Sequence, residues 1–173
     1  MICWLIGMSG SGKTTIAEAL YKNLKPTCRH LVFIDGDQFR EVFKNDADHT
    51  VEGRAKNAAR ISNLCKALDT QNIHVIAAVL SIFPDWQAWN RENFSSYQEI
   101  FLDISLETLK QRDTKGLYSG AEDGSIKNVV GYDIEFPRPS HSDLMLSEAD
   151  QQQGVVACVG RIKTLIGPLD SAH

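Results

Sequence analysis

Long apolar runs are missing from this chain of 173 residues. A membrane-spanning helix needs about 20 consecutive, mainly apolar residues, and no segment of the sequence approaches that length. The N-terminal apolar run, residues 2–6, is too short for a signal peptide and has no basic flank. We therefore expect a soluble, cytoplasmic protein that has no membrane as a partner.

The chain also lacks an excess of positive charge and has no closely paired cysteines. The formal net charge of −4 argues against a nucleic-acid polymer as a partner, but a local basic cluster could still bind a small anion. The cysteines form no C-x-x-C pair, have no histidine cluster beside them and lie mostly in apolar segments. We expect reduced, structural thiols at Cys3, Cys28, Cys65 and Cys158.

No internal repeat, low-complexity tract or linker divides the chain, so we expect one domain that spans residues 1–173. Apolar runs alternate with segments of helical period. Strands are predicted at residues 2–6, 30–35, 73–79, 99–104 and 143–147, and helices at residues 14–24, 38–43, 52–68, 85–94, 106–112 and 151–166. Continuous apolar strands joined by helices predict a three-layer α/β sandwich, with a five-stranded parallel sheet covered by helices on both faces.

The stretch GMSGSGKTT follows the first predicted strand and precedes a predicted helix. It fits the pattern G-x-x-x-x-G-K-[ST], in which backbone N–H groups surround phosphate oxygens at the positive end of a helix. We expect Lys13 to reach the β- and γ-phosphates of ATP, and the Thr14 hydroxyl to hold Mg²⁺. The predicted ATP-binding residues are Gly7, Ser9, Gly10, Ser11, Gly12, Lys13, Thr14 and Thr15, with Arg112 from the lid described below.

Two carboxylates, Asp35 and Asp37, follow the second predicted strand. This strand should end beside the first, which brings both carboxylates near the γ-phosphate together with Lys13. A carboxylate there can take the proton of a hydroxyl acceptor or orient metal-bound water, so we expect catalytic roles for these three residues. A structural alternative is that Asp37 only caps the short helix that follows.

The helix predicted at residues 52–68 carries an apolar stripe that includes Leu64, and Arg54 and Asn57 continue it at the same spacing. An arginine that faces inward usually meets an anion or a carboxylate. With Arg40, these two residues predict a pocket for an anionic acceptor such as a nucleotide. A solvated helix end with an internal ion pair is the alternative.

Residues 113–142 show no period, and glycine recurs in them. An aperiodic segment of this length in a compact domain is often a functional lid. We expect it to close over the carboxyl ends of the strands and to exclude water from the transferring phosphoryl group. The cations available for that step are Arg112, Lys115 and Lys127.

Several classes of nucleotide-binding protein fit less well than a small kinase. The N-K-x-D signature of a switch GTPase is missing, and residues 113–116 match D-x-x-G only after a predicted helix. An ATP-driven machine would need a longer chain with extra modules. A catalytically silent nucleotide-binding protein would not need Asp37, and a kinase of sugar acids would not need Arg54 and Asn57.

Five motifs, GMSGSGKTT, IDGDQFR, RAKNAARI, QRDTKGLY and IKNVVGYD, occur in an order and approximate spacing that resemble the adenylyl-sulfate (APS) kinase family, from residue 2 to about residue 147. The resemblance implies a P-loop nucleoside-kinase fold with a mobile lid, often dimeric, which leaves a homodimer open. It also implies transfer of the γ-phosphoryl group of ATP to the ribose 3′-hydroxyl of adenylyl sulfate. By position, Asp37 matches the family's base and Asp35 its neighbouring acid. The matched acceptor-binding residues are Arg40, Arg54, Asn57 and Lys127.

Departures from the family pattern are concentrated on the acceptor side. The family stacks the acceptor adenine between two phenylalanines, whose positions are His49 and Val129 here. The S-P-Y-R stretch after the third strand reads S-I-F-P and lacks its arginine, for which Arg91 is a candidate substitute. This combination is similar to an APS-kinase-like subgroup of surface-polysaccharide pathways, whose acceptors include cytidine diphosphoramidate. We therefore expect a small, non-standard nucleotide acceptor next to His49 and Val129, with a genuine adenylyl-sulfate kinase as the alternative.

Overall fold

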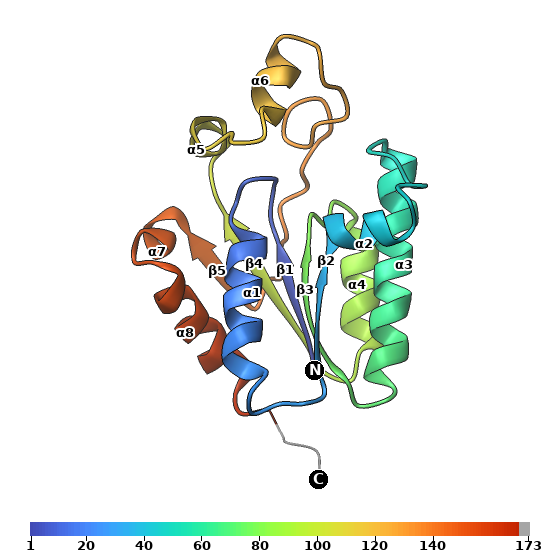
Figure 1. The fold of residues 1–173 in the computed structure, drawn as a ribbon, viewed down its shortest axis with the longest axis vertical. Coiled ribbons are helices and arrows are strands. Elements are labelled where there is room, and N and C mark those ends of the chain that lie inside the picture. Colours follow the sequence, from blue (N-terminus) through green and yellow to red (C-terminus); the bar gives the residue numbers. More distant parts are fainter. Residues whose placement is uncertain (170–173) are drawn as a thin grey trace.

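The computed structural model describes residues 1–169 and contains the predicted parallel sheet (Figure 1). The last four residues of the predicted domain, 170–173, lie outside the described part. The strand order is β2-β3-β1-β4-β5, and every neighbouring pair is parallel. The strands are β1 Ile2–Ile6, β2 Leu31–Asp35, β3 His74–Val79, β4 Tyr97–Asp103 and β5 Leu144–Ser147.

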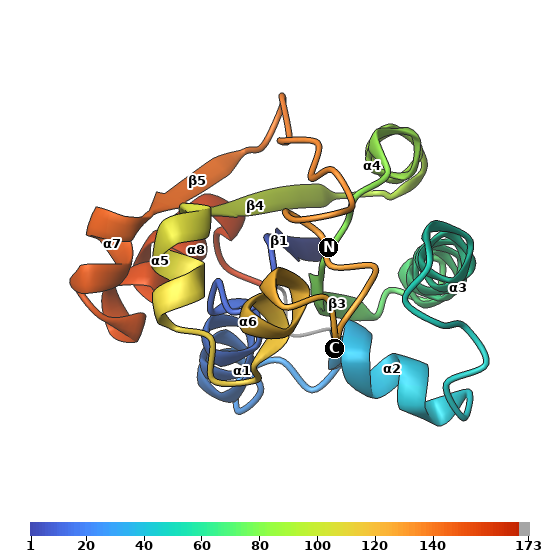
Figure 2. The ribbon, with the colours of Figure 1, turned by 90° about the horizontal axis from the view of Figure 1, so that it is seen from above.

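Helices cover both faces of the sheet, which confirms the three-layer α/β arrangement (Figures 1 and 2). Helices α1 and α8 lie on one face, α3 and α4 lie on the other, and α5 and α6 lie beyond the carboxyl ends of the strands. The helices are α1 Lys13–Leu24, α2 Gly36–Val42, α3 Val51–Asp69, α4 Pro84–Asn93, α5 Leu106–Gln111, α6 Leu117–Glu122, α7 Glu148–Gln152 and α8 Val155–Ile166.

Strand β1 shows why a continuous apolar run predicts a central parallel strand. Cys3 and Leu5 pack into the core under α1 and α8, whereas Ile2, Trp4 and Ile6 pack into the core under α3 and α4. Because both faces are covered, each of these five side chains is at most 3% exposed. All four cysteines are free and buried, as predicted. None of the helices in residues 1–169 is long and apolar enough to cross a membrane.

Two parts of the predicted secondary structure are wrong. The helix predicted at residues 151–166 is two helices, because Gly154 breaks it with φ 93° and ψ 164° and α7 begins earlier, at a Ser147–Asp150 capping box. The lid, predicted to be aperiodic, contains α6 and a small apolar core under it. The stripe on α3 also differs from the prediction, since Leu64 is exposed and Ser62 is buried in its stead.

Candidate active site

The phosphate loop, residues 7–15, joins β1 to α1 at the carboxyl edge of the sheet. Gly10 and Gly12 adopt the left-handed backbone that favours glycine, with φ of 79° and 91°. Gly7 is needed for space, since a Cβ there would lie 2.6 Å from Ser11 Oγ and 3.1 Å from the Leu102 carbonyl oxygen. The loop therefore has the tight, backbone-lined shape that binds phosphate groups.

The ammonium group of Lys13 turns back across this loop and donates a hydrogen bond to the Met8 carbonyl oxygen at 2.8 Å. Burial lowers the pKa of Lys13 to about 8, although the nearby charges of Asp37 and Asp35 oppose the shift. Lys13 is thus mainly cationic near pH 7, and its charge lies close to two carboxylates. The structure brings these three predicted catalytic residues together.

Asp35 connects the phosphate loop to α2. Its Oδ2 accepts a hydrogen bond from Thr14 Oγ1 at 2.7 Å, and its Oδ1 accepts from the backbone N–H groups of Asp37 and Gln38 at 2.9 and 3.2 Å. The N-cap of α2 is therefore Asp35, and the alternative that Asp37 is merely the cap is wrong. The Asp37 carboxylate is 75% exposed instead, with the Lys115 ammonium 3.6 Å away.

Oxygen atoms for a divalent cation are few but well placed. No group of three or more His, Cys, Asp or Glu side chains is arranged to hold a metal ion within residues 1–169. Mg²⁺ prefers oxygen ligands and commonly takes only one or two from the protein, with the rest from phosphates and water. The Thr14 hydroxyl beside the Asp35 carboxylate fits that pattern.

Arg40 is 8% exposed and supports the segment between α2 and α3. Its Nη1 donates hydrogen bonds to the carbonyl oxygens of Ala47 and Asp48, the second at 2.7 Å. Its Nε atom is buried and has no hydrogen-bond partner in the described part of the chain. Arg40 thus keeps one buried, unpaired donor next to the segment that carries the predicted acceptor residue His49.

Arg54 joins the start of α3 to the lid. Its Nε donates to the His49 carbonyl oxygen at 2.9 Å, and its Nη2 donates to the Asn128 carbonyl oxygen at 2.8 Å. Burial and then the charge of Arg40 lower the pKa of Arg54. Burial and the charges of Arg40 and Arg54 lower the pKa of His49 as well. Arg40 and Arg54 therefore form a positive cluster, which keeps the neighbouring His49 imidazole mainly neutral near pH 7.

Asn57 lies beside this cluster with an unsatisfied amide. Its Nδ2 donates a long hydrogen bond of 3.4 Å to the Gly36 carbonyl oxygen, while its buried Oδ1 has no partner within the described residues. The side chain is thus oriented toward the start of α2, where Asp37 lies. Arg40, Arg54, His49 and Asn57 are brought together as predicted.

Other predicted acceptor residues are placed differently. Val129 is 1% exposed and packs in the lid core with Leu109 and Tyr118, so its side chain offers no exposed face to an acceptor in this conformation. Lys127 is exposed on the lid. Arg91 pairs with Asp143 at 3.0 Å and lies 5.1 Å above the ring of Tyr97, the first residue of β4. The prediction that Arg91 replaces the missing arginine of the acceptor site is wrong, because Arg91 lies at the amino edge of the sheet, opposite the phosphate loop.

Gln151 contacts the phosphate loop, although no sequence motif indicated it. Its Nε2 donates to the Ser11 carbonyl oxygen at 2.7 Å, and its Oε1 accepts from Arg112 Nη1 at 3.0 Å. Arg112 is therefore held beside the phosphate loop. The only signal in the sequence was Gly154, which could have indicated a break before α8.

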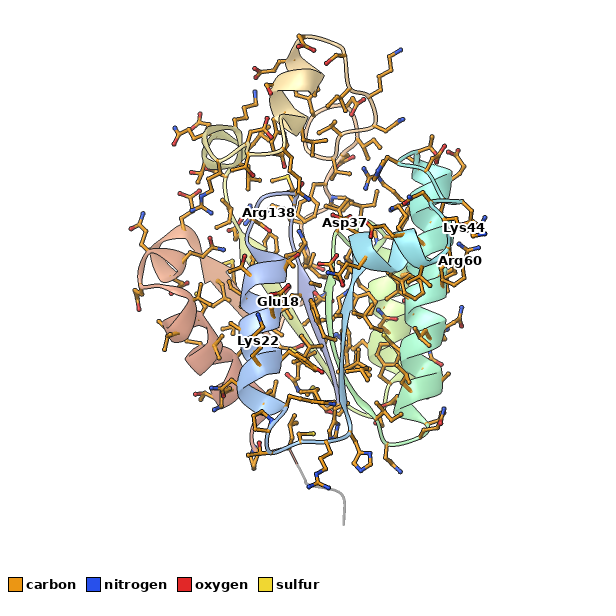
Figure 3. The ribbon with its side chains drawn as sticks, viewed as in Figure 1. Glu18, Lys22, Asp37, Lys44, Arg60 and Arg138 are labelled. Atoms are coloured by element: carbon orange, nitrogen blue, oxygen red, sulfur yellow. The ribbon has the colours of Figure 1, made fainter. Side chains whose placement is uncertain are left out.

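Two cavities flank the phosphate loop. One of about 310 Å³ lies along α1 and is lined by Thr14, Thr15, Glu18, Ala19, Lys22 and Val155. The other, of about 510 Å³, lies between the carboxyl end of β4 and residues 131–138, and Met8, Phe136 and Arg138 are among its lining residues. Figure 3 shows Glu18 and Lys22 along α1, and Asp37 and Arg138 near the carboxyl edge.

Comparisons with known proteins agree with this geometry. Residues 1–147 match the sequence model of a family described as adenylylsulphate kinase. A cytidine diphosphoramidate kinase of Campylobacter jejuni is 40% identical over 148 residues, which cover 86% of each chain. An adenylyl-sulfate kinase of Marinobacter nauticus is 35% identical over 160 residues, which cover 91% of this chain and 79% of the relative.

A solved structure supports the same assignment. The Mycobacterium tuberculosis APS kinase CysC in complex with AMPPNP and APS superposes with a TM-score of 0.85 at 26% identity. The superposition covers 95% of this chain and 96% of that one. The similarity therefore includes the sheet, the phosphate loop and the lid.

Proposed function

Because the chain belongs to the adenylylsulphate kinase family and is an ATP-dependent phosphotransferase, we propose that it phosphorylates the ribose 3′-hydroxyl of a nucleotide acceptor other than adenylyl sulfate. Cytidine diphosphoramidate is the first candidate, since the relative named for that substrate is 40% identical. The alternative to this proposal is a genuine adenylyl-sulfate kinase, as the Marinobacter nauticus relative is named. One observation supports the preference: neither predicted stacking position keeps the phenylalanine of the family pattern, because the smaller, polar imidazole of His49 replaces one and the buried, non-aromatic Val129 replaces the other.

The phosphate side of the proposed mechanism rests on the loop and its lysine. Backbone N–H groups of residues 7–15 would surround the β-phosphate, and Lys13 would exchange the Met8 carbonyl oxygen for phosphate oxygens. Mg²⁺, when bound, would supply charge neutralisation on the phosphates, with the Thr14 hydroxyl as its protein ligand. Asp35 would orient that hydroxyl through the hydrogen bond already present.

Asp37 is the proposed general base. As the acceptor oxygen forms its bond to the γ-phosphorus, its O–H bond breaks and the proton passes to the Asp37 carboxylate, while ADP departs. The Asp37 carboxylate is exposed and does not cap α2, which supports this role. Lys115 would remain near the reacting groups and stabilise negative charge on the transferring phosphoryl group.

The acceptor is proposed to bind between α3 and the lid. Arg40, Arg54 and Lys127 would meet its anionic groups, and Asn57 would use its unpaired Oδ1. His49 would contact the base. Val129 would take part only if the lid rearranged, because its side chain now packs in the lid core.

We further propose that residues 1–173 act as one kinase domain with a lid at about residues 113–142. Cytoplasmic action is consistent with the use of ATP and with four free, buried thiols, because the cytosol keeps thiols reduced. Contacts between the lid and the rest of the domain, such as the one from Arg54 to Asn128, would break and form as the lid moves.

ADP release from Mg-ATP tests this proposal when cytidine diphosphoramidate and adenylyl sulfate are offered in parallel to the purified protein. We expect the higher kcat/KM with the cytidine compound. A higher value with adenylyl sulfate would contradict the proposed acceptor and assign the protein to sulfate activation. Gluconate serves as a control, because turnover with a sugar acid would overturn the nucleotide-acceptor proposal altogether.

A further inference from the structure

Helix α7 touches three parts of the nucleotide side of the site, and it lies just beyond the residues that match the family model, 1–147. We infer that Gln151 of this helix is a positioning residue for ATP, which holds the Arg112 guanidinium beside the phosphate loop. The inference rests on the proposed kinase function in one respect: Arg112, predicted from the sequence to bind ATP, contacts the bound nucleotide.

The Gln151 amide has the chemistry that this position requires. It donates to the Ser11 carbonyl oxygen and accepts from Arg112, at 2.7 and 3.0 Å. A neutral amide can do both at once, whereas a carboxylate only accepts and an ammonium only donates. The amide also lies directly against the loop, because a Cβ at Gly12 would be 3.7 Å from Nε2 and 3.9 Å from Oε1.

A second contact from α7 determines where the helix before Arg112 begins. Glu148 Oε1 accepts hydrogen bonds from the backbone N–H and the hydroxyl of Ser105, at 2.8 and 2.7 Å. Ser105 is the N-cap of α5, and Arg112 is its C-cap. Helix α7 therefore contacts both ends of α5, and Gln151 adds the connection from α5 to the phosphate loop.

Helix α7 has only five residues, too few for stable helical structure without tertiary support. Its orientation comes from three anchors: the Ser147–Asp150 capping box, an ion pair between Arg161 and Asp150, and the turn at Gly154. In one continuous helix α7 would share the axis of α8. The anchors therefore maintain the direction in which Gln151 reaches the loop.

The ligand recognised through Arg112 is the nucleoside triphosphate. A guanidinium binds phosphate oxygens through parallel N–H groups and also stacks on a nucleobase. The cavity of about 310 Å³ adjoins the phosphate loop at Thr14 and Thr15, runs along α1 and is bordered by Val155, the first residue of α8. Loss of Gln151 would remove the hydrogen bond that holds the Arg112 guanidinium at the phosphate loop and leave only the attraction to the charge of Glu148, which weakens ATP binding but leaves Lys13 and Asp37 in place.

The test compares Gln151→Ala, Arg112→Ala and the double variant. The matched control is Gln152→Ala, since Gln152 is an exposed neighbour on the same helix. We expect Gln151→Ala to weaken binding of Mg-AMPPNP about three- to tenfold, the net effect of one hydrogen bond, with kcat within about twofold of the parent where an acceptor is turned over. Because Gln151 acts through Arg112, the double variant should bind no more weakly than Arg112→Ala alone.

Unchanged or tighter binding by Gln151→Ala would overturn the inference, and so would losses that add fully in the double variant. A merely structural role would lower the melting temperature and produce additive losses. Calorimetric binding of Mg-AMPPNP needs no acceptor, so it tests Gln151 even if neither acceptor is phosphorylated. Failure of the proposed acceptor and failure of this inference are thus distinguishable.

Discussion

The Lys115 ammonium lies 3.6 Å from the Asp37 carboxylate, which joins the start of the lid to the first turn of α2. Both side chains are more than 70% exposed, and exposed ion pairs contribute little to the free energy of unfolding. The contact instead determines where Lys115 lies: this cation of the lid is next to Asp37, whereas the neighbouring Asp35 is engaged as the N-cap of α2.

Replacing Asp37 by Ala should separate binding from turnover. We expect kcat to fall about 10²- to 10⁴-fold, the usual contribution of a general base, while the Kd for Mg-ATP changes less than about threefold. Glu41→Ala is the matched control, since Glu41 is an exposed acid on the same short helix. Single-turnover kinetics and calorimetry check both values, and retention of rapid turnover by Asp37→Ala would remove the base from the mechanism.

Asp35 should contribute both to the free energy of unfolding and to the binding of Mg²⁺. In Asp35→Ala, α2 loses its N-cap and Thr14 loses its hydrogen-bond acceptor. We expect the free energy of unfolding to fall by about 1 kcal/mol, and half-maximal activity to require more Mg²⁺. Thr50→Ala, which removes the N-cap of α3, should cost similar stability with no change in the Mg²⁺ requirement. Equal Mg²⁺ curves for the two variants would contradict the proposed second role of Asp35.

The His49 imidazole should titrate below its ordinary pKa of 6.5, because it is partly buried and faces Arg40 and Arg54. The folded protein then binds fewer protons than the unfolded chain as the pH falls through 6.5, so this residue makes the fold less stable at acid pH. Arg54→Met should raise the pKa without restoring it fully, since burial and Arg40 remain. Proton NMR titration of His49 measures this, and an anionic acceptor should raise the pKa as well.

Restoring phenylalanine should have opposite outcomes at His49 and Val129, the two positions that depart from the family pattern. His49→Phe should raise kcat/KM for adenylyl sulfate about two- to tenfold, because it replaces the small, polar imidazole by a larger apolar ring that stacks on a purine. His49→Leu, which is apolar but not aromatic, separates stacking from simple apolar contact. Val129→Phe should instead destabilise the protein by about 1–3 kcal/mol through overpacking of the lid core. A gain in activity from Val129→Phe would contradict the buried position of that side chain.

Local patterns were sufficient for the sheet and for the phosphate side of the site. The buried run of β1, the glycines of the phosphate loop and the acids after β2 each depend on residues close in the sequence. Their chemistry could therefore be predicted before the fold was known. The family and the type of reaction followed from the same motifs and are confirmed by the comparisons.

Long-range packing accounts for what the sequence did not indicate. The contact from Gln151 to Ser11 joins residues 140 positions apart, and no local pattern predicts it. Val129 matched an acceptor position, but packing against Leu109 and Tyr118 turns it into the lid core. Arg91 followed the third strand closely in sequence, yet α4 carries it back to the amino edge of the sheet, where it pairs with Asp143.

The most direct measurement is phosphorus NMR of the product formed from Mg-ATP and cytidine diphosphoramidate. The account predicts a new phosphomonoester resonance coupled to the ribose H3′ proton, with the diphosphoramidate group unchanged and one ADP formed per product. A phosphate on the 2′-hydroxyl, or one added to the diphosphoramidate group, would contradict the assignment of Asp37 as the base for a 3′-hydroxyl.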